Sequence, residues 1–184
     1  MAITYAKNSC LIKTPPVIEI GNGVYTIVKV GNYLVMAEDL HEDLGTLGVD
    51  YVIGSNNGHY YYKAASIQSL LSQQILDGWN LPVAGYYANF FDDLISLAGG
   101  AAKIAANGGD SWPGTNETGL SFLPWGTAET NNNTPKNTNR YFLNPGSSGS
   151  VNTMSYSGSY GWQTSSVSLT TSRCYPVRLY RTIS

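Results

Sequence analysis

Two short segments restrict the possible folds of this chain more than any other feature. The first runs from Gly78 to Pro82 and reads GWNLP, and the second runs from Thr115 to Trp125 and reads TNETGLSFLPW. Each holds a glycine that permits a turn, a proline that fixes the backbone direction and a large apolar tryptophan. Neither follows the period of a helix or of a long strand. We therefore expect two fixed pieces of irregular structure, with the rings of Trp79 and Trp125 buried.

The polar side chains of the second segment have a structural interpretation. Asn116 and Thr118 can bond to nearby backbone groups and hold an irregular loop, and Gly119 permits a turn that a side chain would obstruct. The same residues could instead contact a ligand, with Asn116 and Glu117 as adjacent oxygen donors. We favour the structural interpretation, because a loop without helix or strand pairing needs side chains to satisfy its backbone groups.

The first half of the chain carries several signals for strands. Residues 24–30 and 33–36 flank a Gly-Asn turn pair, which predicts a hairpin. Residues 51–53 and 59–62 are two further short strand candidates on either side of a Gly- and Asn-rich turn. These elements predict a set of short, mostly antiparallel strands.

Two helices are predicted, at residues 64–76 and 86–97, because apolar residues recur there every three to four positions. The expected buried sides hold Ile67, Leu70, Leu71 and Ile75 in the first helix, and Phe90, Phe91, Leu94 and Leu97 in the second. From residue 107 onward Gly, Ser, Asn and Thr predominate and helix signals are rare. The predicted class is α+β, with two helices packed on short strands and a long, loop-rich second half.

The length of 184 residues suits one domain with a substantial core. Pro15-Pro16 interrupts regular structure, so we expect residues 1–20 to form an N-terminal arm or attachment segment and residues 21–184 to form the domain. The apolar residues Ile18 and Ile20 leave open that the end of this arm is instead a first strand.

The charge content excludes some classes of partner. Charged residues make up 12% of the chain, about half the usual share, and the net charge is -2 without a Lys/Arg cluster. Nucleic-acid binding needs concentrated positive charge, so no nucleic-acid partner is expected. No segment approaches the roughly 20 apolar residues of a membrane span, and residues 1–11 lack the apolar core of a signal peptide. We expect no membrane insertion and no export by a signal peptide.

Motifs for catalysis or metal binding are missing from the sequence. The two histidines are His41 and His59, and no HExxH, CxxC, GxSxG or phosphate-cradling Gly-Lys-Ser/Thr pattern occurs. The acidic cluster of residues 38–43 could hold a hard cation, but a solvated loop is the favoured interpretation. We expect no catalytic residues, no metal site and no cofactor.

The best candidate for a recognition surface lies late in the chain. Residues 130–139 are too polar to be core, and Tyr, Trp, Ser and Asn follow within a short span. This composition resembles that of antibody paratopes, where aromatic rings give rigid contact area and small polar residues give adaptable hydrogen bonds. We expect Asn152, Tyr156 and Tyr160 to bind a ligand, with Asn152 and Tyr156 exposed and Trp162 in the core.

The order of several segments resembles a known family, the Fibrobacter succinogenes major paralogous domain. The matching stretches are residues 25–32, 36–40, 78–82, 114–125 and 176–181, in the same order and with similar spacing. The resemblance implies a C-type-lectin-like fold. Members often carry a cysteine pair where this chain has Ile75 and Leu179, so we expect these two side chains to be in contact. Loss of that pair suits folding in a reducing compartment. Pairing of Cys10 with Cys174 stays open.

The resemblance implies a binding or display module. We expect a non-enzymatic structural protein of a bacteriophage particle, a fibre or decoration protein that meets a host-surface glycan or protein. Other virion proteins would bind through the N-terminal arm. Fibre proteins are usually trimers, so by analogy we expect a homo-oligomer, a trimer. The alternative is a bacterial cell-surface or secreted adhesin domain. An enzyme related to formylglycine-generating enzymes is less favoured, because those use a pair of late cysteines and only Cys174 lies there.

Overall fold

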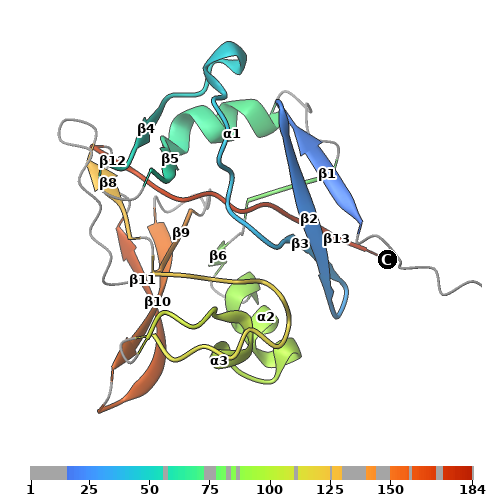
Figure 1. Ribbon diagram of the computed structural model, residues 1–184, viewed down its shortest axis with the longest axis vertical. Helices are drawn as coiled ribbons and strands as arrows, with labels where there is room; N and C mark the ends of the chain where they lie inside the picture. Colours follow the sequence, from blue (N-terminus) through green and yellow to red (C-terminus); the bar gives the residue numbers. More distant parts are fainter. Residues whose placement is uncertain are drawn as a thin grey trace, which may run out of the picture.

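The computed structural model describes residues 16–55, 58–72, 78–81, 84–85, 88–109, 112–124, 126–129, 140–143, 150–157, 159–168 and 172–183. Helices and mostly antiparallel strands are mixed along the chain, so the predicted α+β class is confirmed (Figure 1). Most of the elements are short.

A four-stranded antiparallel sheet joins the two ends of the described chain. Its order is β1 (Val17–Ile20), β2 (Gly23–Val30), β3 (Tyr33–Met36) and β13 (Tyr180–Thr182). The predicted hairpin at residues 24–36 is confirmed, with Gly31 in the left-handed region at φ 58°. The expected arm of residues 1–20 was wrong for Val17–Ile20, because these residues form β1, which pairs with β2, and Ile20 is buried in the core.

A second group of elements lies on one side of this sheet. Strands β4 (Tyr51–Ile53) and β5 (Tyr60–Tyr62) pair as predicted, after a 3-10 turn at Gly45–Leu47, and α1 (Ala64–Ser72) follows. Ile67 is buried as expected. The expected end of this helix and the predicted contact between Ile75 and Leu179 fall outside the described residues, although Leu179 itself is buried.

The second helix is shorter than predicted. Strands β6 (Ala84–Gly85) and β7 (Ala88–Asn89) pair with each other, so α2 begins only at Phe90 and runs to Ala98, before the short α3 (Ala101–Ile104). Phe90 and Leu94 are buried as expected, but Leu97 is 52% exposed. The expectation for Leu97 was wrong because its side chain lies against the Gly31 turn at the edge of the molecule, where a Cβ built on Gly31 would stand 2.8 Å from Leu97 Cδ1.

The late part of the chain holds more sheet than the sequence indicated. Strands β9 (Arg140–Leu143), β10 (Ser150–Ser157) and β11 (Gly161–Ser168) form an antiparallel sheet in the order β11-β10-β9. Strands β8 (Ala128–Glu129) and β12 (Arg173–Cys174) form a small pair. The described residues after 107 contain no helix, as predicted. The expectation of mainly loops was wrong at residues 150–168, where two eight-residue strands form a regular ladder.

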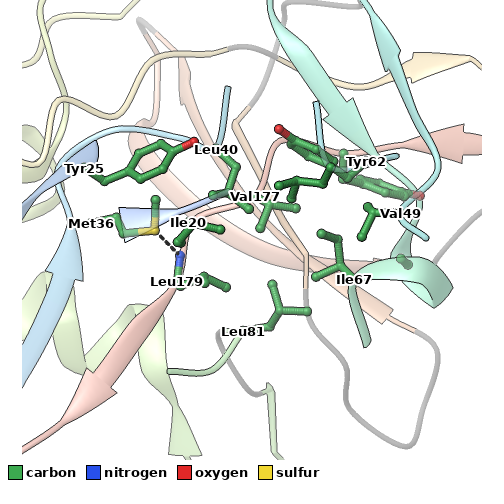
Figure 2. Close-up of a cluster of buried hydrophobic side chains, with 13 residues drawn as sticks. Ile20, Tyr25, Met36, Leu40, Val49, Tyr62, Ile67, Leu81, Val177 and Leu179 are labelled. Atoms are coloured by element: carbon green, nitrogen blue, oxygen red, sulfur yellow. Dashed lines mark hydrogen bonds between the residues drawn. The ribbon is translucent and has the colours of Figure 1, made fainter. Parts of the chain in front are cut away.

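The two faces of the hairpin β2–β3 pack into different apolar clusters. On one face Tyr25 and Met36 join the first cluster, which includes Ile67 of α1 (Figure 2). Met36 Sδ accepts a hydrogen bond of 3.4 Å from the backbone N–H of Leu179. On the other face Val30 and Val35 join the second cluster, built with Phe90, Leu94, Ile104, Trp112, Leu120, Phe122 and Met154. Successive side chains of a strand point to opposite faces, so one hairpin can pack against both clusters.

The tryptophan that anchors the second segment is Trp112. Its ring is buried in the second cluster, and its Nε1–H donates to the carbonyl oxygen of Phe122 at 2.9 Å. Trp79 was expected to be buried but is only half-buried, packed against the edge of the first cluster. Trp125 falls outside the described residues. The fully buried, hydrogen-bonded ring is therefore that of Trp112, just before the second segment, and not that of Trp79 in the first.

The second segment holds its own irregular backbone, as predicted. Asn116, at φ 53°, accepts a hydrogen bond from the backbone N–H of Ser121 (2.7 Å) and donates to Ser121 Oγ (2.9 Å). Thr118 Oγ1 donates to the carbonyl oxygen of Lys103 at 3.0 Å. Gly119 adopts φ 78°. Side-chain bonds thus replace the ladder that a strand would have.

Cys174 is a free, buried thiol. Cys10, the partner that the sequence left open, falls outside the described residues. Burial raises the pKa of the Cys174 thiol to about 11. A thiol held protonated in this way is a poor nucleophile at neutral pH, because the thiolate is the reactive form.

Candidate functional site

Two hollows stand out in the described part of the chain. One has a volume of about 490 Å³ and lies beside Asp39, between the loop after β3 and the second segment. The other has a volume of about 340 Å³ and lies between α2, the start of α3 and β11. Small-molecule sites span about 300–1,000 Å³, so either hollow is large enough for a small ligand.

The first hollow is built on a buried ion pair. Asp39, 3% exposed, accepts from Arg178 Nε at 2.9 Å on one oxygen and lies 3.2 Å from His59 Nε2 on the other. The prediction of a solvated loop for residues 38–43 was therefore wrong at Asp39. The backbone explains its burial: Met36 N–H bonds to the carbonyl oxygen of Leu179, which brings the C-terminal segment and Arg178 alongside this loop.

Arg178 connects this loop to the second segment. Its guanidinium donates to the carbonyl oxygen of Leu120 through Nη1 and lies 4.2 Å from the centre of the Phe122 ring. A buried guanidinium needs such partners, because desolvation of an unpaired charge is costly. The charged groups at the floor of the first hollow thus connect parts of the fold, and we assign them a structural role.

The remaining polar groups of the first hollow are also bonded within the chain. Glu38 Oε1 accepts from the backbone N–H of Thr26 at 2.8 Å, and His41 Nδ1 lies 3.1 Å from the carbonyl oxygen of Asp39. Ser121 Oγ accepts from Asn116 Nδ2. These bonds engage Glu38, His41 and Ser121 within the fold.

The end of the acidic cluster forms a turn. Asp43 Oδ1 accepts from the backbone N–H of Gly45 at 2.8 Å, and this bond, aided by the Tyr51 hydroxyl, lowers the pKa of the Asp43 carboxyl. Within the described residues, no group of three or more His, Cys, Asp or Glu side chains is arranged to hold a metal ion.

The second hollow is a groove with an apolar base and a polar rim. Ile95, Ala101 and Trp162 form the base. The rim consists of Asp92 and Ser96 of α2 and Gln163 and Thr164 of β11, and all four are exposed. Thr164 Oγ1 donates to Asp92 Oδ1 at 3.3 Å, which joins the helix to the strand across the groove.

The ring of Trp162 is fixed from behind. It meets Trp112 edge to face, with 4.7 Å between ring centroids, and Tyr156 at 5.2 Å. Trp162 was expected to be core, but it is half-buried and lines the groove. The second cluster therefore holds an aromatic ring in place while part of its surface stays accessible.

The three residues predicted to bind a ligand are placed differently from one another. Tyr160, in the turn of the β10–β11 hairpin, is 78% exposed. Tyr156 was expected to be an exposed loop residue, but it lies in β10 and is half-buried, because its ring packs against Trp162 and the second cluster. Asn152 was also expected in a loop but lies in β10, where its backbone pairs with Phe142 and Ser166. The Asn152 side chain and residues 130–139 are outside the described part.

The groove itself was missed by sequence reasoning. Asp92 and Thr164 are 72 positions apart, and no local pattern indicates that they meet. The aromatic and amide content of residues 160–165 was the one usable signal.

None of the described helices has the length and apolar character needed to cross a membrane. Comparison of the chain with family models, curated proteins and solved structures gives no match.

Proposed function

We propose that this chain is a non-enzymatic display and adhesion domain of C-type-lectin-like type, carried on a bacteriophage particle as a fibre or decoration protein. The mixed fold of short antiparallel strands and few helices is compatible with that type. The resemblance of residues 25–32, 36–40, 78–82, 114–125 and 176–181 to the segments of the Fibrobacter succinogenes major paralogous domain family, in the same order, supports it further. The domain would attach the particle to a glycan or protein on the host surface.

The β10–β11 hairpin is the observation that carries this proposal. Residues 150–168 contain no charged side chain and are rich in Ser, Thr, Tyr, Asn and Gln. Figure 1 shows the hairpin reaching the periphery of the molecule, and Tyr160 at its turn is 78% exposed. An exposed tyrosine among small polar residues provides contact area at low cost in side-chain entropy, as in antibody paratopes.

Assembly on the particle would use the other end of the chain. Residues before β1 would bind other virion proteins, and a homo-oligomer, by analogy a trimer, would present several hairpins at once. Several weak sites on one particle together bind with an avidity far above the affinity of a single site. The same hairpin would serve a bacterial surface or secreted adhesin, and neighbouring genes for capsid and portal proteins, or for outer-membrane and pilus proteins, would separate the two origins.

Replacement of Tyr160 tests the adhesion role. We expect Tyr160→Ala to reduce binding of the purified protein to a panel of whole bacterial cells, while the melting temperature stays the same, since exposed positions change stability by no more than about 0.5 kcal/mol. Ile53→Ala is the matched control, because Ile53 is also exposed and apolar but lies on β4. Binding that is equal in wild type and Tyr160→Ala would contradict the adhesion role of the hairpin.

A further inference from the structure

We propose that the groove between α2 and β11 binds one pyranose ring of a neutral sugar without a bound metal ion. The inference rests on the proposed adhesion function and names the ligand class and the residues of a site that is separate from the Tyr160 turn. Four properties of the groove support it: its base, its rim, its charge and its rigidity.

The base of the groove matches the apolar face of a sugar ring. Ile95, Ala101 and Trp162 present carbon atoms there. A pyranose carries its hydroxyl groups around its edge and exposes C–H groups on its faces. The face of an indole ring carries partial negative charge and attracts the partly positive hydrogens of such C–H groups. Trp162 is therefore the platform on which one face of the ring would lie.

The rim of the groove matches the hydroxyl groups. Asp92, when ionised, offers two acceptor oxygens, and a pair of neighbouring sugar hydroxyls can donate to both. Gln163 offers an amide that both donates and accepts, and the Ser96 hydroxyl does the same, whereas the Thr164 hydroxyl, which donates to Asp92, can accept. Hydrogen bonds to a charged acceptor are roughly twice as strong as neutral ones, so Asp92 would be the main polar contact.

The charge of the groove selects against acidic sugars. Asp92 is the one charged side chain among its described lining residues, and neither Lys nor Arg is present among them. A uronic acid or a sulfated sugar would bring a second negative charge close to Asp92 without a cation to offset it. Like-charge placement of this kind is a common means of rejecting the wrong ligand.

The groove is also rigid before any ligand binds. Trp162 is held by Trp112 and Tyr156, and α2 is anchored by the buried side chains of Phe90 and Leu94. The bond between Thr164 and Asp92 fixes the distance across the rim. Preorganisation reduces the entropy lost on binding, which matters for a small ligand with few contacts.

Saturation-transfer NMR with simple glycosides tests the proposal. The probes are the methyl pyranosides of glucose, galactose, mannose and N-acetylglucosamine, with methyl glucuronide as the acidic probe. We expect transfer to the ring C–H protons of at least one neutral probe, much less to the glucuronide, and no change on addition of a chelator. Asp92→Asn should weaken binding by at least about tenfold, the loss that accompanies one hydrogen bond to a charged group, and Gln163→Ala by about two- to tenfold, the loss of one neutral hydrogen bond. Ser165→Ala, exposed on β11 but outside the groove, should bind as wild type does.

Several results would overturn the proposal. They are the absence of transfer to every neutral probe, equal transfer to the glucuronide, loss of binding in chelator, or binding that persists in both groove variants. Failure here is distinguishable from failure of the adhesion role. If Tyr160→Ala abolishes cell attachment while no glycoside binds the groove, the adhesion role stands and the sugar site does not. If the groove binds glycosides but Tyr160→Ala leaves attachment unchanged, the hairpin turn has no part in adhesion.

Discussion

A single buried carboxylate, Asp39, joins parts of the chain that are far apart in sequence. Its partner Arg178 lies 139 positions away, and Arg178 in turn bonds to Leu120. Removing one member of a buried pair leaves the other charge without its partner, so Asp39→Asn and Arg178→Met should each cost about 3–5 kcal/mol of unfolding free energy. The variant with both changes should cost clearly less than the sum, because neither charge then remains. Urea unfolding of the four proteins measures this, and additive losses would show that the pair is not coupled.

The buried phenols predict a loss of stability in alkali. Burial raises the pKa of Tyr25 to about 12, and it raises the pKa of Tyr62 further. In the unfolded chain tyrosine ionises near pH 10, so above that pH the unfolded state gives up protons that the folded state keeps. The stabilising contribution is therefore complete below about pH 10 and is lost as pH rises through about 12. Melting temperature measured from pH 8 to 12 should fall steeply in this window, and the fall should be shallower in Tyr25→Phe. An equal slope in the variant would contradict the assignment.

At the scale of elements, the irregular segment of residues 112–124 behaves as a folded unit. Gly114 packs so closely against α3 that a Cβ there would stand 2.1 Å from the carbonyl oxygen of Ala105. Gly114→Ala should therefore destabilise strongly, since the neighbouring atom is backbone and cannot rotate away. Gly45→Ala is the control, because there the nearest atom is the end of the Asp43 side chain at 3.0 Å. Thermal melts compare the two, and equal losses would mean that the close approach is not rigid.

Trp112 and Trp79 differ in burial, although the sequence predicted that Trp79 would be buried. Trp112 is fully buried and its N–H is bonded, so Trp112→Ala should cost about 3–5 kcal/mol. Trp79 is only half-buried, so Trp79→Ala should cost distinctly less. Chemical denaturation of both variants checks the order. A larger loss for Trp79→Ala would mean that the first cluster depends on that ring more than its exposure indicates.

Local patterns explain which elements could be predicted from the sequence. The β2–β3 hairpin, the β4–β5 pair and the start of α1 depend on neighbours within a few positions, and these were predicted. The side-chain bonds between Asn116 and Ser121 are local as well. The Asp39–Arg178 pair and the groove at Asp92 and Thr164 depend on contacts between residues 139 and 72 positions apart, and nothing in a single sequence indicates such contacts. The long strands β10 and β11 were missed because Ser-rich strands resemble loops in composition.

At the scale of the whole molecule, the hairpin β2–β3 makes the two apolar clusters depend on each other. Tyr25 and Met36 pack on one face of the hairpin, and Val30 and Val35 pack on the other. Arg178 adds a second connection, from the loop beside the first cluster to the segment that carries Leu120 and Phe122 of the second. A cluster that lost its packing would expose one face of a sheet that the other cluster needs.

This arrangement predicts one cooperative unfolding transition for the described fold. Ile67→Ala removes packing from the first cluster and Leu94→Ala from the second, and each should cost about 2–5 kcal/mol. Because the clusters share a hairpin, each change should lower the protection of slowly exchanging amides in both α1 and α2 by a similar amount. Transitions followed by tryptophan fluorescence and by far-ultraviolet circular dichroism should also coincide in every variant. If Ile67→Ala lowered amide protection in α1 and left α2 unchanged, the clusters would be separate folding units, and the shared hairpin and Arg178 would not couple them.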